Sequence, residues 1–317
     1  MKILFTSVGR RVELIQAFEN VANRLKVNLE IYGADITDSA PALYFCDHTV
    51  IVPKIKDENY IPTLIKVCNE EKIDALIPTI DTDLLLLSKH KNDFGNTKVI
   101  ISNEDKVSIC RDKRYTADYF KSIGLNSPHP VDDYKIYDGK FPAFIKPKDG
   151  SSSIFAYKVE NEEELISYSH QVPDYIIQPF ITGTEYTVDV FCDFEGNPIY
   201  ITPRIRLAVR SGEVLKTEIK QDDTIINEIK KLIKDYKPCG PITVQLIKEH
   251  NTNNDYYIEI NPRFGGGAPL SIKAGADSAE AIIRLLRGEK LIYQDKKAED
   301  GAIFSRFDQS VRVKWLL

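Results

Sequence analysis

The sequence of 317 residues contains little cysteine: there are five, and no two of them form a Cys-x-x-Cys pair. Such scattered cysteines argue against a disulfide framework or a zinc site and favour a reducing, cytoplasmic environment. The longest leucine run, Leu84 to Leu87, is too short to cross a bilayer, so we expect no membrane association. Arg10 and Arg11 stand where a signal peptide would need apolar residues, which argues against secretion.

The chain also lacks an excess of positive charge. It has 47 acidic residues against 42 lysines and arginines, a formal net charge of -5, which argues against a protein that coats nucleic-acid phosphates. Its five histidines show no spacing typical of a metal site or a catalytic dyad, and no Gly-x-Ser-x-Gly elbow is present. What remains is a globular protein that acts on or binds small molecules.

The first hundred or so residues alternate apolar and amphipathic stretches. We expect helices near residues 11–25, 61–72 and 83–90, and strands near residues 2–8, 29–35, 48–53, 74–79 and 98–102. This order predicts a doubly wound parallel α/β sheet. Ligands bind at the carboxyl ends of such strands, where Asp81 and Asp83 follow one strand.

From about residue 141 the pattern changes to paired strands with glycine-containing turns. Turns are predicted at residues 195–197 and 211–213, a helix at 224–235, two further strands at 242–249 and 256–261, and a last helix near 278–287. The order of an α/β unit followed by mixed α+β structure predicts two or three subdomains around a cleft.

Two of these strands carry a set of oxygen-bearing side chains. The period of two places Glu259 and Asn261 on one face and Ile258 and Ile260 on the other, and Gln245 can meet them from the neighbouring strand. Carboxylate and amide oxygens suit Mg²⁺ that keeps water and phosphate as its other ligands. Arg263 follows as an anion clamp. For these residues alone, an exposed polar strand face is the better interpretation.

Three further segments suggest a nucleotide site. Lys146 ends an apolar strand before the turn at Asp149–Ser153, whose backbone N–H groups and hydroxyls can face phosphate oxygens. Gln178–Ile181 form a short apolar linker, and Glu185 begins the next strand. Taken alone, these segments are better explained as an ordinary serine-rich loop and a strand–turn–strand corner.

Four charged residues are candidates for binding substrate groups. Asp81 and Asp83 can bind an ammonium group, although Asp83 is equally suited to cap a helix. Arg204 and Arg206 can bind a carboxylate, because strand alternation places them on one face with Arg210. An exposed sheet surface would show the same alternation.

Taken in order, these segments resemble the ATP-grasp superfamily, and most closely one ATP-grasp unit of the carbamoyl-phosphate synthetase large subunit. The resemblance extends from residue 1 to about residue 290, and Gln245 followed by Glu-Ile-Asn-Pro-Arg at 259–263 is its most specific part. It rests on five segments: ILFTSVGRR, ICRDKRYTADYFKSIGLNSP, FPAFIKPKDGSSS, YIIQPFITGTEYTVDV, and TVQLIKE with YIEINPR. It implies an N-terminal α/β domain (1–103), a central subdomain with the phosphate loop (104–183) and a C-terminal subdomain with the metal site (184–317).

The resemblance also implies roles for single residues. Lys113 and Lys146 take the positions of the two basic nucleotide contacts, and Glu185 that of the acid that binds ribose. Lys146 and Arg263 take the catalytic positions, Arg263 steadying the transferred group. The remaining positions are the phosphate-covering loop (Gly150, Ser151, Ser152, Ser153), the adenine hinge (Gln178, Pro179, Phe180, Ile181) and the magnesium ligands (Gln245, Glu259, Asn261).

The sequence departs from the family pattern in three respects. Gln178 stands where an acid is common, the loop has serines where relatives have more glycine, and the chain carries one ATP-grasp unit where the synthetase resembles two. A single unit cannot perform the two phosphorylations of that enzyme.

The resemblance therefore implies an ADP-forming ligase that uses ATP and Mg²⁺, or Mn²⁺ in its place. It would phosphorylate a small carboxylate and join the acyl phosphate to an amine or a thiol. Its partners would be those small molecules and, in a homodimer, a second copy. The open alternatives are a kinase that releases an acyl phosphate such as carbamoyl phosphate, and a non-catalytic ATP-binding regulatory protein. A Rossmann dehydrogenase is disfavoured, because Gly-x-Gly-x-x-Gly is absent after the first strand.

Overall fold

The computed structural model describes residues 1–150 and 154–313, and its first sheet is parallel throughout. This sheet has the order β3-β2-β1-β4-β5, built from β1 (Lys2–Thr6), β2 (Glu30–Asp35), β3 (His48–Ile51), β4 (Ala75–Pro78) and β5 (Lys98–Val99). Its helices are α1 (Val12–Leu25), α2 (Tyr60–Glu71) and α3 (Leu84–Lys89), with 3₁₀ turns η1 (Pro41–Phe45) and η2 (Lys91–Phe94). The predicted parallel α/β domain is confirmed. Its last strand is only two residues long, shorter than the pattern suggested.

The second sheet has six strands in the order β13-β12-β9-β10-β11-β14. Its strands are β9 (Gly183–Cys192), β10 (Pro198–Arg210), β11 (Glu213–Ile219), β12 (Pro241–Glu249), β13 (Asp255–Asn261) and β14 (Ile303–Ser305), and all pairings are antiparallel. The turns predicted at 195–197 and 211–213 separate β9 from β10 and β10 from β11.

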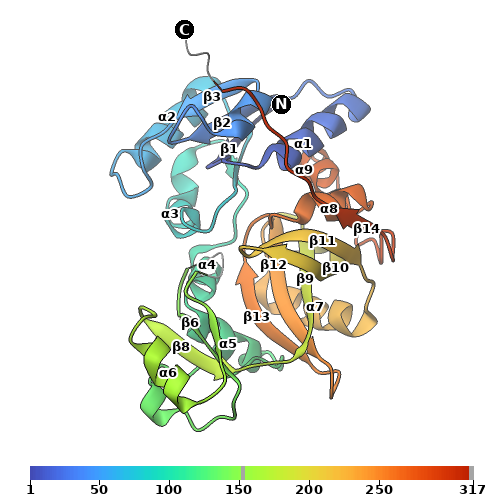
Figure 1. Cartoon of the computed structure of the whole chain (residues 1–317). Helices are drawn as coiled ribbons and strands as arrows, with labels where there is room; N and C mark the ends of the chain where they lie inside the picture. Colours follow the sequence, from blue (N-terminus) through green and yellow to red (C-terminus); the bar gives the residue numbers. More distant parts are fainter. Residues whose placement is uncertain (151–153, 314–317) are drawn as a thin grey trace.

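The third sheet is small and antiparallel. It has the order β7-β6-β8, built from β6 (Ala143–Pro147), β7 (Tyr157–Val159) and β8 (Tyr175–Pro179). Helix α6 (Glu162–Ser169) and the turn η3 (Tyr134–Ile136) pack on it. Figure 1 shows this sheet beside the six-stranded sheet, with the parallel domain above both.

The remaining helices connect these units through shared cores. Helices α4 (Glu104–Arg111) and α5 (Lys113–Ser122) contact β13, and the side chains of Tyr119 and Phe120 are buried with those of α7 (Asp223–Tyr236). Helices α8 (Ala268–Lys273) and α9 (Ser278–Leu286) pack on α1 instead. The three sheets therefore lie within the three predicted segments, whereas several helices pack on another segment. The boundaries 1–103, 104–183 and 184–317 remain a prediction.

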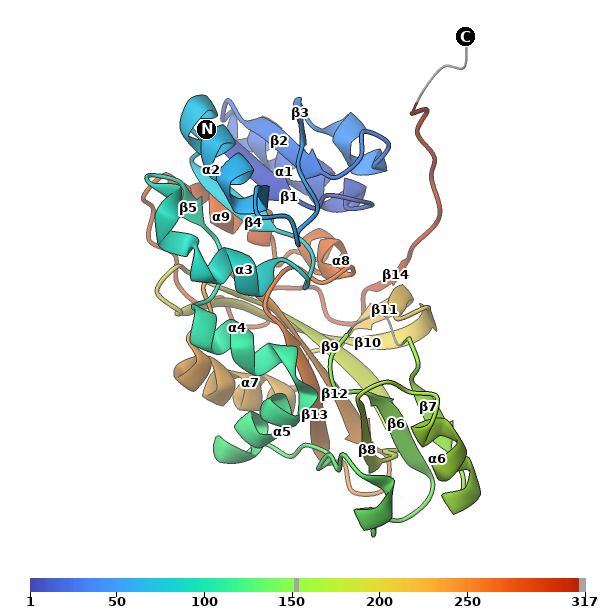
Figure 2. The same cartoon turned by 90° about the vertical axis from the view of Figure 1, so that its left-hand side faces the viewer.

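The C-terminal segment contacts the parallel domain. After β14 the chain runs along the molecule to the parallel domain (Figures 1 and 2). There the hydroxyl of Tyr44 donates to the carbonyl of Val313. Among the described residues, no helix combines the length and apolarity needed to cross a membrane.

Candidate active site

A pocket with an empty volume of about 740 Å³ opens between the three-stranded sheet and the ends of β12 and β13. Phe144 and Phe180 lie in its wall with their ring centroids 6.2 Å apart. The pocket is lined by Pro128, Phe144, Lys146, Gln178, Pro179, Phe180, Ile181, Thr182, Gly183, Glu185, Ile247 and Ile258. A mostly apolar slot with a few polar groups at its edge suits a planar heterocycle that carries a charged tail.

All the residues proposed for the adenine hinge and the ribose contact line this pocket. The side chain of Gln178 is buried, and its amide nitrogen donates to the carbonyl of Pro128 at 2.6 Å. That side chain therefore holds the neighbouring loop that contains Pro128. Glu185 lies with more than half of its side chain exposed, 3.5 Å from the guanidinium of Arg206.

Two lysines mark the charged end of the pocket. Lys146 is 8% exposed, and burial together with the like charge of Lys113 lowers the pKa of Lys146 to about 8, while Glu259 opposes the shift. Burial also lowers the pKa of Lys113. Its ammonium donates to the carbonyl of Gly150 at 3.1 Å. Within the described residues, the ammonium of Lys146 has no hydrogen bond or ion pair, so an anionic ligand would stabilise it.

Lys113 is held in place by the start of α5. Asp112 caps this helix by accepting from the backbone N–H of Arg114, and the N–H of Lys113 donates to the carbonyl of Lys148 at 2.9 Å. Gly150 adopts φ +98°, a backbone conformation that favours glycine. The predicted loop residues Ser151, Ser152 and Ser153 lie outside the described residues.

The polar candidates share one face of the six-stranded sheet. Gln245 is the direct cross-strand partner of Glu259, and Thr243 is that of Asn261. On the other side, β12 places Ile247 opposite Glu185. Because directly opposed residues lie on the same face, the metal candidates and the nucleotide pocket form one continuous surface.

Ile258 departs from the predicted alternation. The pairing register shifts between Gln245 and Leu246, so that Leu246 faces Tyr257 and Ile258 has no partner on β12. This extra residue is a β-bulge, and Ile258 lines the nucleotide pocket beside Glu259, whereas Ile260 is buried in the core. The expectation that Ile258 lies on the face opposite Glu259 was wrong, because a bulge leaves no mark in a two-residue period.

The metal candidates have the chemistry that Mg²⁺ requires. Asn261 donates to Glu259 at 2.9 Å, and Gln245 accepts from Arg206 at 2.9 Å, so each side chain is oriented. No cluster of three or more His, Cys, Asp or Glu side chains occurs across the described residues, and this set offers one carboxylate and two amide oxygens. So few protein ligands suit an ion that is also held by phosphate and water.

Buried guanidinium N–H groups beside the metal candidates also favour an anionic ligand. In the described part of the chain, the buried Nε atom of Arg263 has no hydrogen-bond partner, and that of Arg206 has only the 3.5 Å ion pair with Glu185. Phosphate oxygens would satisfy such guanidinium donors. The residues present therefore fit a magnesium–nucleotide complex.

Arg263 connects this site to the parallel domain. Its guanidinium forms an ion pair with Asp81, which follows β4, and also donates to Asn261 at 3.3 Å. Through Arg263, Asp81 thus lies near the metal candidate Asn261, although its carboxylate is already engaged. Arg206, proposed for a substrate carboxylate, instead contacts Gln245 and Glu185 on the nucleotide side.

Asp83 is not accessible to a substrate. Its side chain is fully buried and accepts hydrogen bonds from Tyr60 at 2.9 Å, Thr6 at 3.0 Å and Ser7 at 3.3 Å. Burial raises the pKa of Asp83 to about 6, and these hydroxyls oppose the shift. It occupies the N-cap position of α3 without a side-chain capping bond. We therefore remove Asp83 from the candidate substrate residues.

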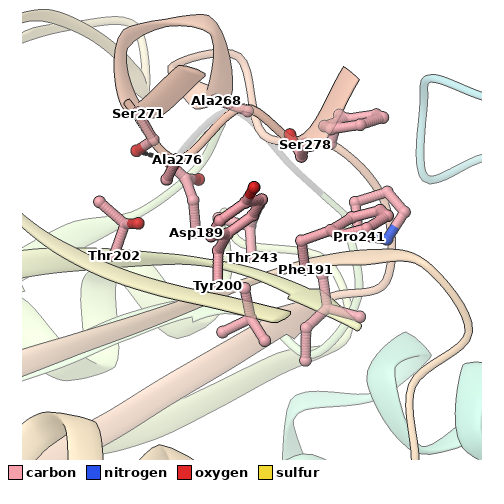
Figure 3. A pocket seen from close by; sticks show the side chains of 13 residues that line it. Asp189, Phe191, Tyr200, Thr202, Pro241, Thr243, Ala268, Ser271, Ala276 and Ser278 are labelled. Carbon is pink, nitrogen blue, oxygen red and sulfur yellow. Dashed lines mark hydrogen bonds between the residues drawn. The ribbon is translucent and has the colours of Figure 1, made fainter. Parts of the chain in front are cut away.

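Arg204 is likewise buried, at 2% exposure, and its charge is balanced by Asp189 at 2.8 Å. Asp189 lines a smaller pocket, with an empty volume of about 280 Å³, between the sheet and α8, where it also accepts from Ser271 (Figure 3). Arg204 therefore stabilises the sheet below α8 and does not reach the cleft. β-Bulges after Arg206 separate Arg210 from both arginines, which the predicted alternation missed.

The sequence itself matches two protein families. Residues 3–101 match the family described as PylC-like, N-terminal domain, and residues 110–267 match the ATP-grasp domain. The chain belongs to the ATP-grasp superfamily.

Two curated relatives that match part of this chain are ligases. The chain is 25% identical over 181 residues to 3-methyl-D-ornithine–L-lysine ligase of Methanosarcina acetivorans, covering 56% of this chain and 46% of that one. It is 28% identical over 153 residues to D-alanine–D-alanine ligase B of Clostridium perfringens, covering 40% and 49%. The chain thus spans about half the length of these relatives.

Solved structures show the same fold. The biotin carboxylase domain of Hydrogenobacter thermophilus 2-oxoglutarate carboxylase, in complex with MgADP, aligns with a TM-score of 0.77 at 17% identity over 95% of this chain and 73% of that one. The L-amino acid ligase of Bacillus licheniformis aligns with a TM-score of 0.72 at 17% identity over 90% and 74%.

Proposed function

We propose that this protein is an ADP-forming carboxylate–amine ligase that uses MgATP. The observation that carries the proposal is the single surface formed by the apolar pocket, by Lys146, which has no hydrogen bond or ion pair among the described residues, and by the opposed side chains of Gln245 and Glu259. Adenine would occupy the apolar pocket, with Glu185 at the ribose, and the phosphates would extend toward Lys146 and Lys113. Gln245, Glu259 and Asn261 would hold the magnesium ion.

The reaction needs little covalent chemistry from the protein. A carboxylate oxygen of the first substrate attacks the γ-phosphorus, the bond to the β–γ bridging oxygen breaks, and ADP leaves. The amine then attacks the acyl carbon, a C–N bond forms, phosphate leaves, and the amine loses one proton to solvent. When Mg²⁺ is bound, it neutralises part of the negative charge of the phosphates. Lys146 and Arg263 stabilise the charge on the transferred group and orient it.

We propose amino acids as the substrate class. The curated relatives named above join amino acids, as their names state, and the engaged carboxylate of Asp81 at the cleft is a group that a substrate ammonium can share. We further propose a homodimer acting in the cytoplasm, supported by the dimeric carboxylase domain among the fold relatives and by five free cysteines. Light scattering of the purified chain tests the dimer.

The test is the release of ADP and phosphate from MgATP across a matrix of amino acids. Bicarbonate, ammonia and simple carboxylates belong in the matrix as well. We expect release that requires both a carboxylate and an amine, with a new C–N product detected by mass spectrometry. Release with a carboxylate alone and no coupled product would support the kinase alternative. MgATP binding without turnover across the whole matrix would contradict the ligase proposal.

A further inference from the structure

Arg11 lies between β1 and α1, beside the loop that follows β4. Its guanidinium donates to the carbonyl of Thr79 at 3.0 Å. Two residues further along the same loop, Asp81 forms the ion pair with Arg263. One arginine from the parallel domain and one from the segment after β13 thus contact the same loop, and neither lines the adenine pocket.

The loop after β1 determines where Arg11 points. Gly9 adopts φ +45°, and its N–H donates to the carboxylate of Asp35 at 2.9 Å, which fastens the loop to the end of β2. The N–H of Arg11 donates to the carbonyl of Val8 at 2.8 Å and closes the turn. The neighbouring Arg10 points outward instead: 83% of its side chain is exposed, and its one ion pair with a described residue is a long one of 3.7 Å to Asp308. Two adjacent arginines therefore have opposite environments.

The charge of Arg11 is not balanced by a partner. Burial, and next the like charge of Arg263, lower the pKa of Arg11 to about 10, while Glu213 and Asp81 oppose the shift. In residues 1–150 and 154–313, no carboxylate lies within ion-pair distance of Arg11. Asp81 is engaged by Arg263, and Glu213 by Arg306 at 3.2 Å. The like charge of Arg263 disfavours a charged Arg11, so an anion that both guanidinium groups contact would stabilise them.

We propose that Arg11 and Arg263 together bind the carboxylate of the first substrate, and the phosphoryl group once it is attached, between the parallel domain and the metal strands. This inference rests on the proposed ligase function and adds a substrate-binding residue from the parallel domain. Guanidinium forks match carboxylate and phosphate oxygens in geometry and charge. Arg263 reaches the metal candidates through Asn261, so the bound group would lie next to the γ-phosphate.

The experiment uses inorganic phosphate as the probe, because phosphate is the group that leaves the acyl phosphate. Isothermal titration calorimetry measures phosphate binding to the full chain saturated with MgADP, for the wild type, Arg11→Gln, Arg11→Lys and the matched control Arg10→Gln. We expect Arg11→Gln to weaken phosphate binding at least about tenfold, Arg11→Lys less, and Arg10→Gln hardly at all. MgADP binding itself should stay unchanged and shows that each variant is folded.

Several results would overturn the inference. The first is that Arg11→Gln binds phosphate as tightly as the wild type does. The second is that Arg10→Gln weakens phosphate binding as much as Arg11→Gln does. The third is that the wild type saturated with MgADP binds no phosphate. If Arg11→Gln also loses MgADP, Arg11→Lys decides by the same criteria. A second arm uses the carboxylate found by the substrate matrix: its KM should rise in Arg11→Gln while the KM for ATP stays constant. An unchanged KM for the carboxylate overturns the role of Arg11 but does not affect the proposed ligase function. If no substrate pair in the matrix is turned over, the ligase function is contradicted, and the calorimetric test of phosphate binding still applies.

Discussion

Lys146 is buried next to another lysine, so its charge depends on what is bound beside it. In the free protein, burial and Lys113 lower the pKa of Lys146 to about 8, and Glu259 opposes this shift. Phosphate favours the charged form, so a nucleotide binds with uptake of a proton once the pH exceeds this pKa.

We therefore predict that the Kd of MgADP is constant below about pH 7 and rises by up to about tenfold per pH unit above pH 8. Calorimetry at pH 6.5 to 9.5, in buffers of different ionisation enthalpy, measures both the affinity and the proton uptake. The variant Lys146→Arg stays charged throughout and should show a flat profile. An affinity of the wild type that does not change up to pH 9.5 would mean that Lys146 does not contact the phosphates.

Glu259 is the only carboxylate of the proposed metal set. Glu259→Gln keeps the shape of the side chain and removes its charge. We predict a fall in turnover on the order of 100-fold or more, the scale of one lost electrostatic contact in an active site. The half-saturating Mn²⁺ concentration should rise in parallel. Glu195→Gln, in the exposed turn between β9 and β10, is the control. Equal metal dependence of the two variants would exclude Glu259 as a ligand.

At the scale of secondary-structure elements, α5 places Lys113 at the charged end of the pocket. Its cap, Asp112, can be compared with Asn161, which caps α6 by accepting from the N–H of Glu164. Replacing either cap by Ala should cost about 1 kcal/mol of stability. Only Asp112→Ala should weaken MgADP binding several-fold, because only that helix carries a ligand-binding lysine. Thermal melts and calorimetry on both variants test this, and equal nucleotide affinities would show that the cap does not position Lys113.

The elements also show what the sequence could and could not predict. Periodicity located α1 and α7 within a residue or two, because their apolar positions follow a helical repeat that the core buries. It also predicted that Gln245 meets Glu259 and Asn261 from a neighbouring strand, and the structure adds the register, in which Gln245 pairs with Glu259. The bulge at Ile258 and those after Arg206 were not predictable, since a bulge depends on how two strands pair. The burial of Asp83 and Arg204 depends on Tyr60 and Asp189, which are distant in the sequence.

At the scale of the whole molecule, the parallel domain and the site-bearing sheet share a core. Phe18 on α1 is fully buried, with its ring centroid 5.0 Å from that of Phe5 and 6.4 Å from that of Phe264. Phe264 directly follows Arg263. The packing of α1 therefore also supports the segment that carries the proposed anion clamp.

We predict that the wild type unfolds in a single cooperative transition, without separate melting of residues 1–103. Phe18→Ala should destabilise the protein by roughly 3–5 kcal/mol, the usual cost of such a cavity, and lower the midpoint of the whole transition. Differential scanning calorimetry measures both quantities. Two resolved transitions in the wild type, of which only the first responds to Phe18→Ala, would show that the core does not couple the units.

In the proposed reaction, ATP activates a carboxylate as an acyl phosphate. The most direct measurement uses the carboxylate substrate labelled with ¹⁸O in both oxygens, followed by mass spectrometry of the released phosphate during ligation. Attack by the carboxylate on the γ-phosphorus predicts ADP and phosphate that contains one ¹⁸O atom per turnover. Unlabelled phosphate, or AMP that carries the label, would contradict the proposed mechanism.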